Sequence, residues 1–150
     1  MYFYILLANN TIKMIELAKG KYSRISEENY EEMLQTLNVS YLLRKAALAS
    51  TPQQDISELN GIWTIKTSTI LKSVELKFKM DETFDEITPD GRDVSSIATV
   101  EGNKIVLVQN AKKKDQHSTR SIREFTEDGF VLTIEVIGTG VTSIQQFKRL

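Results

Sequence analysis

Cysteine is absent from the sequence, which excludes a disulfide scaffold, a cysteine zinc site and thiol catalysis. The lack of cysteine also fits a reducing compartment. There is a single histidine, His117, so a multi-histidine metal site is impossible, and we expect neither a metal nor a cofactor. Neither sign of charge is in excess: 19 Lys and Arg against 20 Asp and Glu give a formal net charge of −1, which offers no electrostatic case for nucleic-acid binding.

A long hydrophobic run is also missing. The apolar run Tyr2–Ala8 is far shorter than the roughly 18–20 residues of a transmembrane helix. It lacks the basic segment that precedes the core of a signal peptide. The periodic patterns of apolar and polar residues that indicate helices and strands start only after Met14. We therefore expect residues 1–13 to be an N-terminal extension. Residues 14–150 are then long enough to form one domain that buries a core or encloses a cavity.

Helical spacing of apolar residues predicts two short helices near the start of this domain. Ser26 fits as the N-cap of the first, because Glu27–Glu28 suit the positive end of a helix dipole. Ser40 fits as the N-cap of the second, and Pro52 marks its exit. Such helices cover a sheet or form a lid over a cavity mouth. A DNA-binding helix-turn-helix is disfavoured, since the second helix offers only Arg44–Lys45 as cations.

The rest of the chain has the pattern of short strands joined by turns. Asn60–Gly61 is a strong hairpin signal. In Val74–Met80, apolar residues alternate with charged ones, which is typical of a half-buried antiparallel strand. Further turns are predicted at Pro89–Gly91 and Glu101–Asn103. Short strands at this spacing indicate a β-sandwich or a β-barrel.

In the last hairpin, Thr119–Lys148, neither of the two sets of alternate residues is entirely apolar. Side chains alternate between the two faces of a strand, yet the phase that we expect to face inward carries Arg123 and Gln145 beside Phe125 and Phe147. Burying an unpaired charge in a solid core costs several kcal/mol. A hollow interior with water and a polar-headed ligand would accept the arginine. An exposed, two-sided hairpin is the alternative.

Three motifs at fixed spacing carry a resemblance to a known family. Gly20–Tyr22, Asn29–Glu31 and Met33–Leu34 together resemble the N-terminal signature of the intracellular fatty-acid-binding proteins, a family that also holds the cellular retinoid-binding proteins. Arg24 departs from that signature, which has a large apolar residue there. The resemblance continues in register through the second helix, the central strands and the turn at Asp90, and extends from about Gly20 to Leu150.

This resemblance implies an all-β fold: a ten-stranded antiparallel up-and-down β-barrel of the lipocalin-like (calycin) class, capped by a helix-turn-helix lid over a large cavity. It also implies a monomeric carrier, not an enzyme, that binds a long-chain fatty acid or a similar hydrophobic molecule and transports it through the cytoplasm. Nuclear entry is left open. A carrier for a retinoid or another neutral hydrophobic ligand is the alternative.

Two functions from other classes stand beside the carrier. One is an enzyme that uses the same cavity with His117 or a carboxylate as base, but no nucleophile and orienting acid are visible around the histidine. The other is a partner-binding β-domain with a filled interior. Turnover of a bound acyl ester would favour the enzyme, and purified protein that carries no lipid and exposes no cavity to apolar dyes would favour the filled β-domain.

The resemblance also implies where the head group of the ligand binds. Arg123 matches an inner arginine that holds the carboxylate, whereas Gln145 and Phe147 stand where a second arginine and a tyrosine often join it. A charge-assisted hydrogen bond from Arg123 is worth about 1.5–3 kcal/mol, so the sequence favours an anion over an alcohol. Burial of a tail of about 14 methylenes gives a gross figure near 11 kcal/mol, and therefore supplies most of the binding.

The expected ligand-binding residues fall into three groups besides the anchor Arg123. Lid residues that would contact the tail are Tyr30, Met33 and Leu34; apolar residues that would line the cavity are Trp63, Ile65, Leu76, Phe78 and Phe147; polar residues that would hold water or the head group are Thr67, Thr69, Asp90, Arg92 and Gln145. Arg44, Lys45 and Lys72 would lie near the portal, where transient contact with an anionic membrane surface is the minor alternative to plain solubilising charge.

Overall fold

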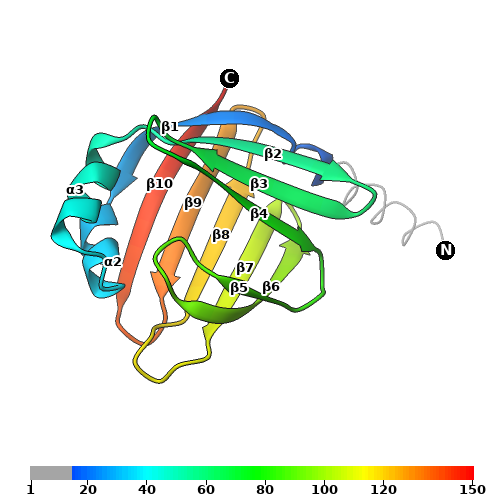
Figure 1. Ribbon diagram of the computed structural model, residues 1–150. Helices are drawn as coiled ribbons and strands as arrows, with labels where there is room; N and C mark the ends of the chain where they lie inside the picture. The colour runs from blue at the N-terminus through cyan, green and yellow to red at the C-terminus, as the bar shows by residue number, and fades with distance from the viewer. Residues whose placement is uncertain (1–14) are drawn as a thin grey trace.

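The computed structural model describes residues 15–150, which form ten antiparallel strands and two helices (Figure 1). The predicted extension, residues 1–13, lies outside the described residues. The helices are α2 (Tyr30–Thr36) and α3 (Tyr41–Ala49). The strands are β1 (Gly20–Glu28), β2 (Gln53–Leu59), β3 (Ile62–Ser68), β4 (Ser73–Lys79), β5 (Phe84–Ile87), β6 (Asp93–Glu101), β7 (Lys104–Ala111), β8 (Thr119–Phe125), β9 (Gly129–Val136) and β10 (Val141–Arg149).

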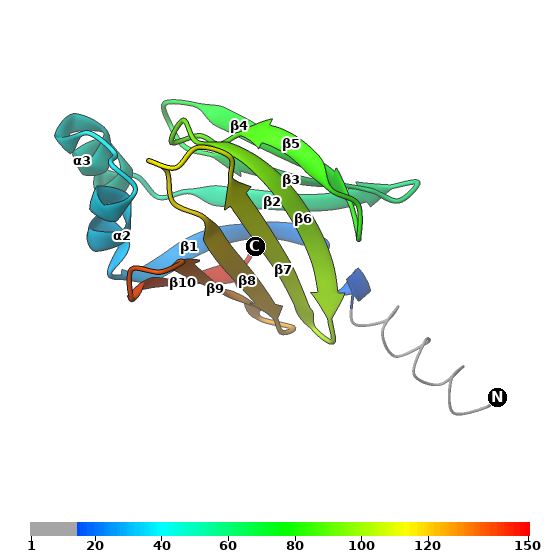
Figure 2. The ribbon, with the colours of Figure 1, turned by 90° about the horizontal axis from the view of Figure 1, so that it is seen from below.

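The strands form one sheet in the order β4-β3-β2-β1-β10-β9-β8-β7-β6-β5. Neighbours in sequence pair, with two exceptions: β4 does not pair with β5, and β1 pairs with β10. The sheet curls around an interior, as Figures 1 and 2 show from two sides. Among the described strands, only β4 and β5 have a free edge, and Phe78 of β4 stacks on Phe84 of β5 with ring centroids 6.3 Å apart. The predicted ten-stranded barrel is therefore confirmed in a nearly closed form.

Local sequence explains the turns and the alternation of the strands. Asn60 and Gly61 adopt φ values of 51° and 81°, the left-handed region that a tight hairpin turn requires, and this confirms the predicted turn between β2 and β3. In β4 the side chains are alternately exposed and partly or fully buried, as the sequence predicts for a strand with one face exposed to solvent.

Helices α2 and α3 lie together at one end of the barrel and form the predicted lid (Figure 1). The predicted cap at Ser26 is wrong: Ser26 continues β1 and pairs with β10, and the helix begins at Tyr30. The Glu27 carboxylate accepts from the backbone N–H of Tyr30 at 3.1 Å, which explains how the helix can start three residues later. Ser40 does cap α3, because its side chain accepts from Leu43 N.

Apolar side chains fill the two ends of the barrel differently. Beneath the lid, Met33 and Leu34 of α2 pack with Val136 in a small cluster. At the opposite end, Tyr22 and Phe130 belong to an aromatic cluster with ring centroids 4.8 Å apart, and the Tyr22 hydroxyl donates to Ala18 O at 2.8 Å. Aromatic rings therefore pack against one another at that end of the barrel.

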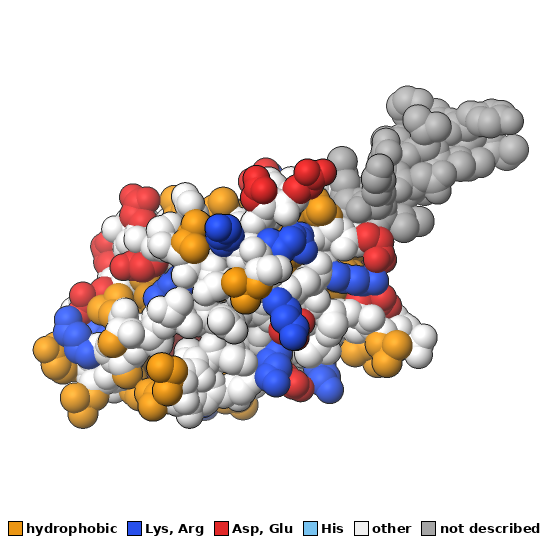
Figure 3. Space-filling model, turned by 90° about the horizontal axis from the view of Figure 1, so that it is seen from above, with side chains coloured by type: hydrophobic (Ala, Val, Ile, Leu, Met, Phe, Trp, Pro, Cys, Tyr) orange, Lys and Arg blue, Asp and Glu red, His pale blue; other side chains and the backbone are white. Residues whose placement is uncertain are grey.

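The surface carries charges of both signs. Figure 3 shows lysine and arginine side chains interspersed with acidic and apolar ones on the face seen from above. Helix α3 buries none of its residues and exposes Tyr41, Leu42 and Leu43 at the outside of the lid. Within residues 15–150, no helix has the length and apolar character needed to cross a bilayer.

Candidate functional site

Arg123 of β8 points into the barrel, where its side chain is almost fully buried. Its Nε donates to Gln54 Oε1 at 3.2 Å, and Gln54 stands on β2, across the interior. The Gln54 amide donates in turn to Thr67 Oγ1 at 3.2 Å. The four N–H groups on Nη1 and Nη2 of Arg123 make no hydrogen bond within residues 15–150, and both nitrogens keep some accessible surface.

Burial also dominates the electrostatics of Arg123. Loss of water around the guanidinium lowers the pKa of Arg123 to about 10, so the group stays protonated at neutral pH. Among the described residues, no carboxylate forms an ion pair with it. The Phe130 ring lies 5.9 Å from Cζ and offers only a weak cation–π contact. An interior cation without a counter-charge is therefore the central feature of the site.

Gln145 of β10, predicted to hold the head group or water, is buried and accepts a hydrogen bond from Arg24 Nη1 at 3.2 Å. Arg24 also donates from Nη2 to Ser50 O at 3.1 Å and lies over the Tyr30 ring at 4.8 Å. Burial raises the pKa of the Tyr30 phenol, and the nearby charge of Arg24 acts in the opposite direction.

Sequence reasoning noted Arg24 only as a departure from the family signature and gave it no role. It also missed Gln54. Arg24 lies two positions from the buried Tyr22 on β1, and Gln54 lies two positions from the buried Ile56 on β2. Side chains two positions apart in a strand point to the same face, so this alternation could have shown that both residues face inward.

The predicted apolar residues come together inside the barrel. Phe147 does not face a polar partner but stacks on Phe130, with ring centroids 4.6 Å apart and planes 11° apart. Tyr30, Met33 and Leu34 pack beneath the lid, as expected for α2. The residues that belong to, or pack against, the main cluster are Trp63, Ile65, Leu76, Phe78 and Phe147.

Thr67 and Thr69 of the predicted polar group lie in different surroundings. The Thr67 hydroxyl accepts the hydrogen bond from the Gln54 amide and so belongs to the interior group around Arg123. Thr69 lies beyond the end of β3, where its N–H donates to Lys72 O at 2.8 Å and its Oγ1 accepts from Lys72 N at 3.3 Å. Thr69 therefore stabilises the turn before β4 and is not brought to Arg123.

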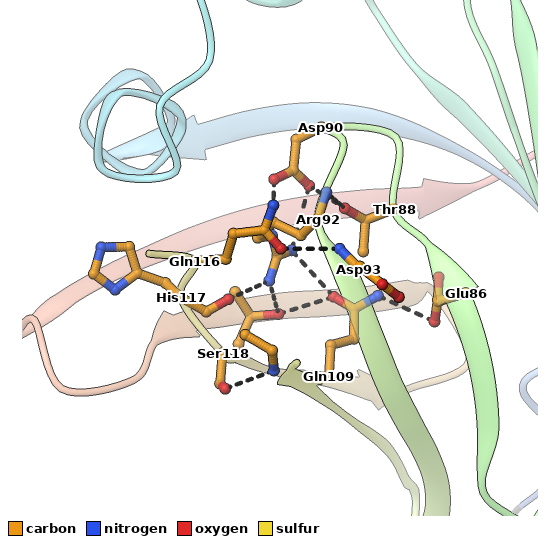
Figure 4. A network of polar contacts seen from close by, with 11 residues as sticks. Glu86, Thr88, Asp90, Arg92, Asp93, Gln109, Gln116, His117 and Ser118 are labelled. Carbon is orange, nitrogen blue, oxygen red and sulfur yellow. Dashed lines mark hydrogen bonds and ion pairs between the residues drawn. The ribbon is translucent and has the colours of Figure 1, made fainter. Parts of the chain in front are cut away.

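Arg92, by contrast with Arg123, is buried in a saturated network (Figure 4). Its Nε donates to Asp90 Oδ2 at 2.8 Å, and its Nη1 donates to His117 O at 2.9 Å and Thr119 Oγ1 at 3.4 Å. Its Nη2 donates to Asp90 Oδ1 at 3.3 Å and Gln109 Oε1 at 3.4 Å. All five guanidinium N–H groups are thus used. The pair Asp90 and Arg92, predicted to hold water or the head group, ties the β5–β6 turn to β7 and β8.

Two depressions lie on the surface. An open groove runs at the far end, between the β8–β9 turn and the end of β10, and includes Ile25 and Val131. A smaller polar pocket borders Asp90, Arg92 and the His117 loop, near the end of α2. Arg123 and its partner Gln54 line neither depression. Among the residues that the structure describes, no three His, Asp or Glu side chains gather in a way that could hold a metal ion.

The sequence matches the lipocalin / cytosolic fatty-acid binding protein family over residues 19–139. It is 36% identical over 137 residues to a fatty acid-binding protein of Tyrophagus putrescentiae, covering 91% of this chain and 99% of that one. It is 41% identical over 119 residues to cellular retinoic acid-binding protein 2 of Mus musculus, covering 77% and 86%. Apo lipid binding protein 8 of Caenorhabditis elegans superposes with a TM-score of 0.85 at 27% identity, covering 90% of this chain and 96% of that one.

Proposed function

The chain belongs to the lipocalin / cytosolic fatty-acid binding protein family, and from this premise we propose that it is a carrier for a long-chain fatty acid. The ligand lies inside the barrel of the domain predicted over residues 14–150, with its carboxylate on Arg123. One observation carries the proposal: Arg123 is a buried, protonated guanidinium that has free N–H donors and no counter-charge among residues 15–150.

A fatty-acid carboxylate supplies what this guanidinium lacks. Because Nη1 and Nη2 are both free, they can make two parallel hydrogen bonds to one carboxylate, with a gain of about 1.5–3 kcal/mol. The apolar residues around the interior then cover the tail, and tail burial sets the scale of the affinity. An alcohol of the same chain length would bury the same tail but would leave the charge of Arg123 uncompensated.

Retinoic acid is the second candidate ligand. The relative from Mus musculus is a cellular retinoic acid-binding protein, and retinoic acid also ends in a carboxylate that Arg123 would neutralise. A neutral retinoid such as retinol fits less well for the same reason that a fatty alcohol does. Competition of oleate with retinoic acid and with retinol separates these ligands.

We expect the protein to act as a monomer in the cytoplasm, without catalytic chemistry. Relatives in the family are binding proteins, and the His117 side chain makes no hydrogen bond within the described part of the chain. The exposed apolar residues of α3 lie next to Arg44 and Lys45, so the lid is the surface through which we expect brief contact with a membrane. We propose no contact with nucleic acid.

The test is a ligand titration of delipidated protein with oleate and with oleyl alcohol. Arg123→Gln removes the charge, and Arg120→Gln is the matched control, because Arg120 lies on the outward phase of the same strand. We expect Arg123→Gln to weaken oleate binding roughly tenfold to a hundredfold and to change alcohol binding little. Equal affinity for acid and alcohol in the wild type would overturn the head-group assignment, and no binding of either would overturn the carrier function.

A further inference from the structure

Glu86 of β5 places a carboxylate on the inner face of the barrel. It lies directly opposite Val94 of β6, which is fully buried, and opposed residues in a sheet share one face. Two positions earlier on β5, Phe84 stacks on the buried Phe78 of β4. Side chains two positions apart in a strand point to the same face. The interior therefore holds a carboxylate as well as the guanidinium of Arg123.

The Glu86 carboxylate is bonded to its neighbours but has no counter-charge. Its Oε2 accepts from Ser96 Oγ at 2.7 Å and from Gln109 Nε2 at 3.4 Å. Its Oε1 makes no hydrogen bond within residues 15–150 and keeps some accessible surface. No lysine or arginine in the described part of the chain forms an ion pair with it. One carboxylate oxygen is thus free to accept a hydrogen bond from a ligand.

The network around Arg92 fixes the position of this carboxylate (Figure 4). Gln109 Oε1 accepts from Thr119 Oγ1 at 2.8 Å and from Arg92 Nη2 at 3.4 Å. The amide nitrogen of Gln109 is therefore the end that faces Glu86. Ser96, the other partner, is itself buried. Both donors to the carboxylate are anchored on β6 and β7, so the acceptor is organised before any ligand arrives.

The strand register separates Glu86 from Arg123 along the barrel. Arg123 lies opposite Leu132 of β9, which belongs to the main apolar cluster. Gln109 shares its row of paired residues with Val136 of β9, which packs with α2 beneath the lid. Leu132 and Val136 are four positions apart, or about 13 Å along the strand. Since β6 and β7 also stand between β5 and β8, the carboxylate lies at the lid end and Arg123 lies farther from the lid.

We propose that Glu86 forms a second polar subsite at the lid end of the interior, and that it selects a long-chain fatty acid with a hydroxyl group near the end of its tail. This inference rests on the proposed function, because it takes the ligand carboxylate on Arg123 as given. From there the tail of a hexadecanoic acid is long enough to bring a terminal hydroxyl to Glu86. The hydroxyl donates to Oε1 in a charge-assisted hydrogen bond.

The chemistry of a carboxylate decides which tail it favours. A carboxylate only accepts hydrogen bonds, so a plain methyl end offers it nothing, and a second carboxylate would add a like charge. An ammonium group also donates, but it is more strongly hydrated and costs more to bring under the lid. A hydroxyl without a partner in an apolar interior loses its hydrogen bonds to water. Glu86 offsets that loss only where the hydroxyl reaches it, so the position of the hydroxyl on the tail matters.

The experiment titrates delipidated protein by calorimetry with hexadecanoic, 16-hydroxyhexadecanoic and 2-hydroxyhexadecanoic acids. The 2-hydroxy acid carries its hydroxyl beside the carboxylate, which cannot reach Glu86 from Arg123. Glu86→Leu removes both acceptor oxygens. Glu86→Gln keeps the shape of the side chain and one neutral acceptor, and it serves as the second variant if Glu86→Leu does not fold. Glu75→Gln is the matched control, because Glu75 is exposed on the outer face of β4.

We expect the wild type and Glu75→Gln to bind 16-hydroxyhexadecanoic acid at least as tightly as hexadecanoic acid. Glu86→Leu should weaken the 16-hydroxy acid at least tenfold and Glu86→Gln by less, while the other two acids change by less than about threefold. The proposal is overturned if the wild type binds the 16-hydroxy acid more weakly than hexadecanoic acid, or if Glu86→Leu leaves that comparison unchanged. It is also overturned if both Glu86 variants weaken all three acids equally, since Glu86 would then only support the barrel wall.

The outcome can be separated from a failure of the carrier function. If hexadecanoic acid binds and Arg123→Gln weakens it, the proposed function stands whatever the 16-hydroxy acid does. A 16-hydroxy acid that does not respond to Glu86 in that case overturns only the second subsite. If none of the three acids binds the wild type, the carrier function and the subsite that rests on it both fail.

Discussion

Replacing Arg123 with glutamine should stabilise the ligand-free protein while it weakens the binding of an acid. Burial lowers the pKa of Arg123 from its ordinary value to about 10. This difference corresponds to roughly 3 kcal/mol against the charged form in the folded state. The group is protonated in both the folded and the unfolded state at neutral pH, so the penalty is fully present below pH 10. It is relieved as the pH rises from about 10 towards the higher pKa of the unfolded chain.

The substitution also removes favourable contacts. Exchanging the charge-assisted hydrogen bond to Gln54 for the neutral hydrogen bond of an amide loses about 1 kcal/mol, and loss of the contact with the Phe130 ring costs about 0.5–1 kcal/mol. The difference leaves Arg123→Gln more stable than the wild type by about 1–2 kcal/mol, or about 2–8 °C in Tm for a chain of this size.

Thermal and urea unfolding of delipidated protein at pH 7 measure this difference, with Arg120→Gln as the control that should melt like the wild type. Saturating oleate should reverse the order, because ligand binding stabilises the wild type by about 2.7 kcal/mol at a hundredfold excess over Kd and the variant by less. A lower Tm for delipidated Arg123→Gln, with Arg120→Gln unchanged, would show that the charge of Arg123 is compensated without ligand. The reasoning about an unpaired cation would then be wrong.

Four further outcomes follow from the same contacts. Gln145→Arg should lower the unfolding free energy of the delipidated protein by about 1–3 kcal/mol, because it sets a second cation against Arg24, and Arg24→Met should restore it in a double-mutant cycle. Arg92→Met should cost about 3–5 kcal/mol in urea unfolding, because it leaves a carboxylate of the saturated network unpaired, while the oleate affinity of the folded fraction changes less than about twofold. Gly129→Ala should lower stability by about 1–3 kcal/mol in thermal melts, because its Cβ would collide with a backbone carbonyl of β10. Oleate affinity should stay constant from pH 7 to 9 and fall as the pH passes about 10, where Arg123 loses its proton, whereas oleyl alcohol binding should not follow that change.

The architecture could be predicted from the sequence because local rules determine most of it. The hairpin turn at Asn60–Gly61 requires left-handed backbone, which these two residue types tolerate. The alternation in β4 fixes which face is buried. The inward phase of the last hairpin also follows from alternation, and the structure buries Arg123, Gln145 and Phe147 accordingly.

The polar partners could not be predicted, because they come from distant parts of the chain. The hydrogen bond between Arg123 and Gln54 joins residues 69 positions apart in the sequence, and the one between Arg24 and Gln145 joins residues 121 positions apart. No local sequence pattern specifies such pairs. The cap at Ser26 was wrong for a related reason. The pairing of β1 with β10 keeps that residue in a strand, and this long-range contact overrides the local preference for a helix start.

Three inner-phase arginines show why residue type alone does not identify a binding site. Arg92 has a carboxylate two positions away on the same turn, and that ion pair and the surrounding acceptors use every donor it has. Arg123 is followed by Glu124, but alternation sends that carboxylate to the outer face, and Arg24 finds only neutral acceptors. The first arginine therefore stabilises the barrel itself, whereas the other two have no counter-charge among residues 15–150. Under the proposed function, the carboxylate of the ligand supplies the counter-charge that Arg123 lacks.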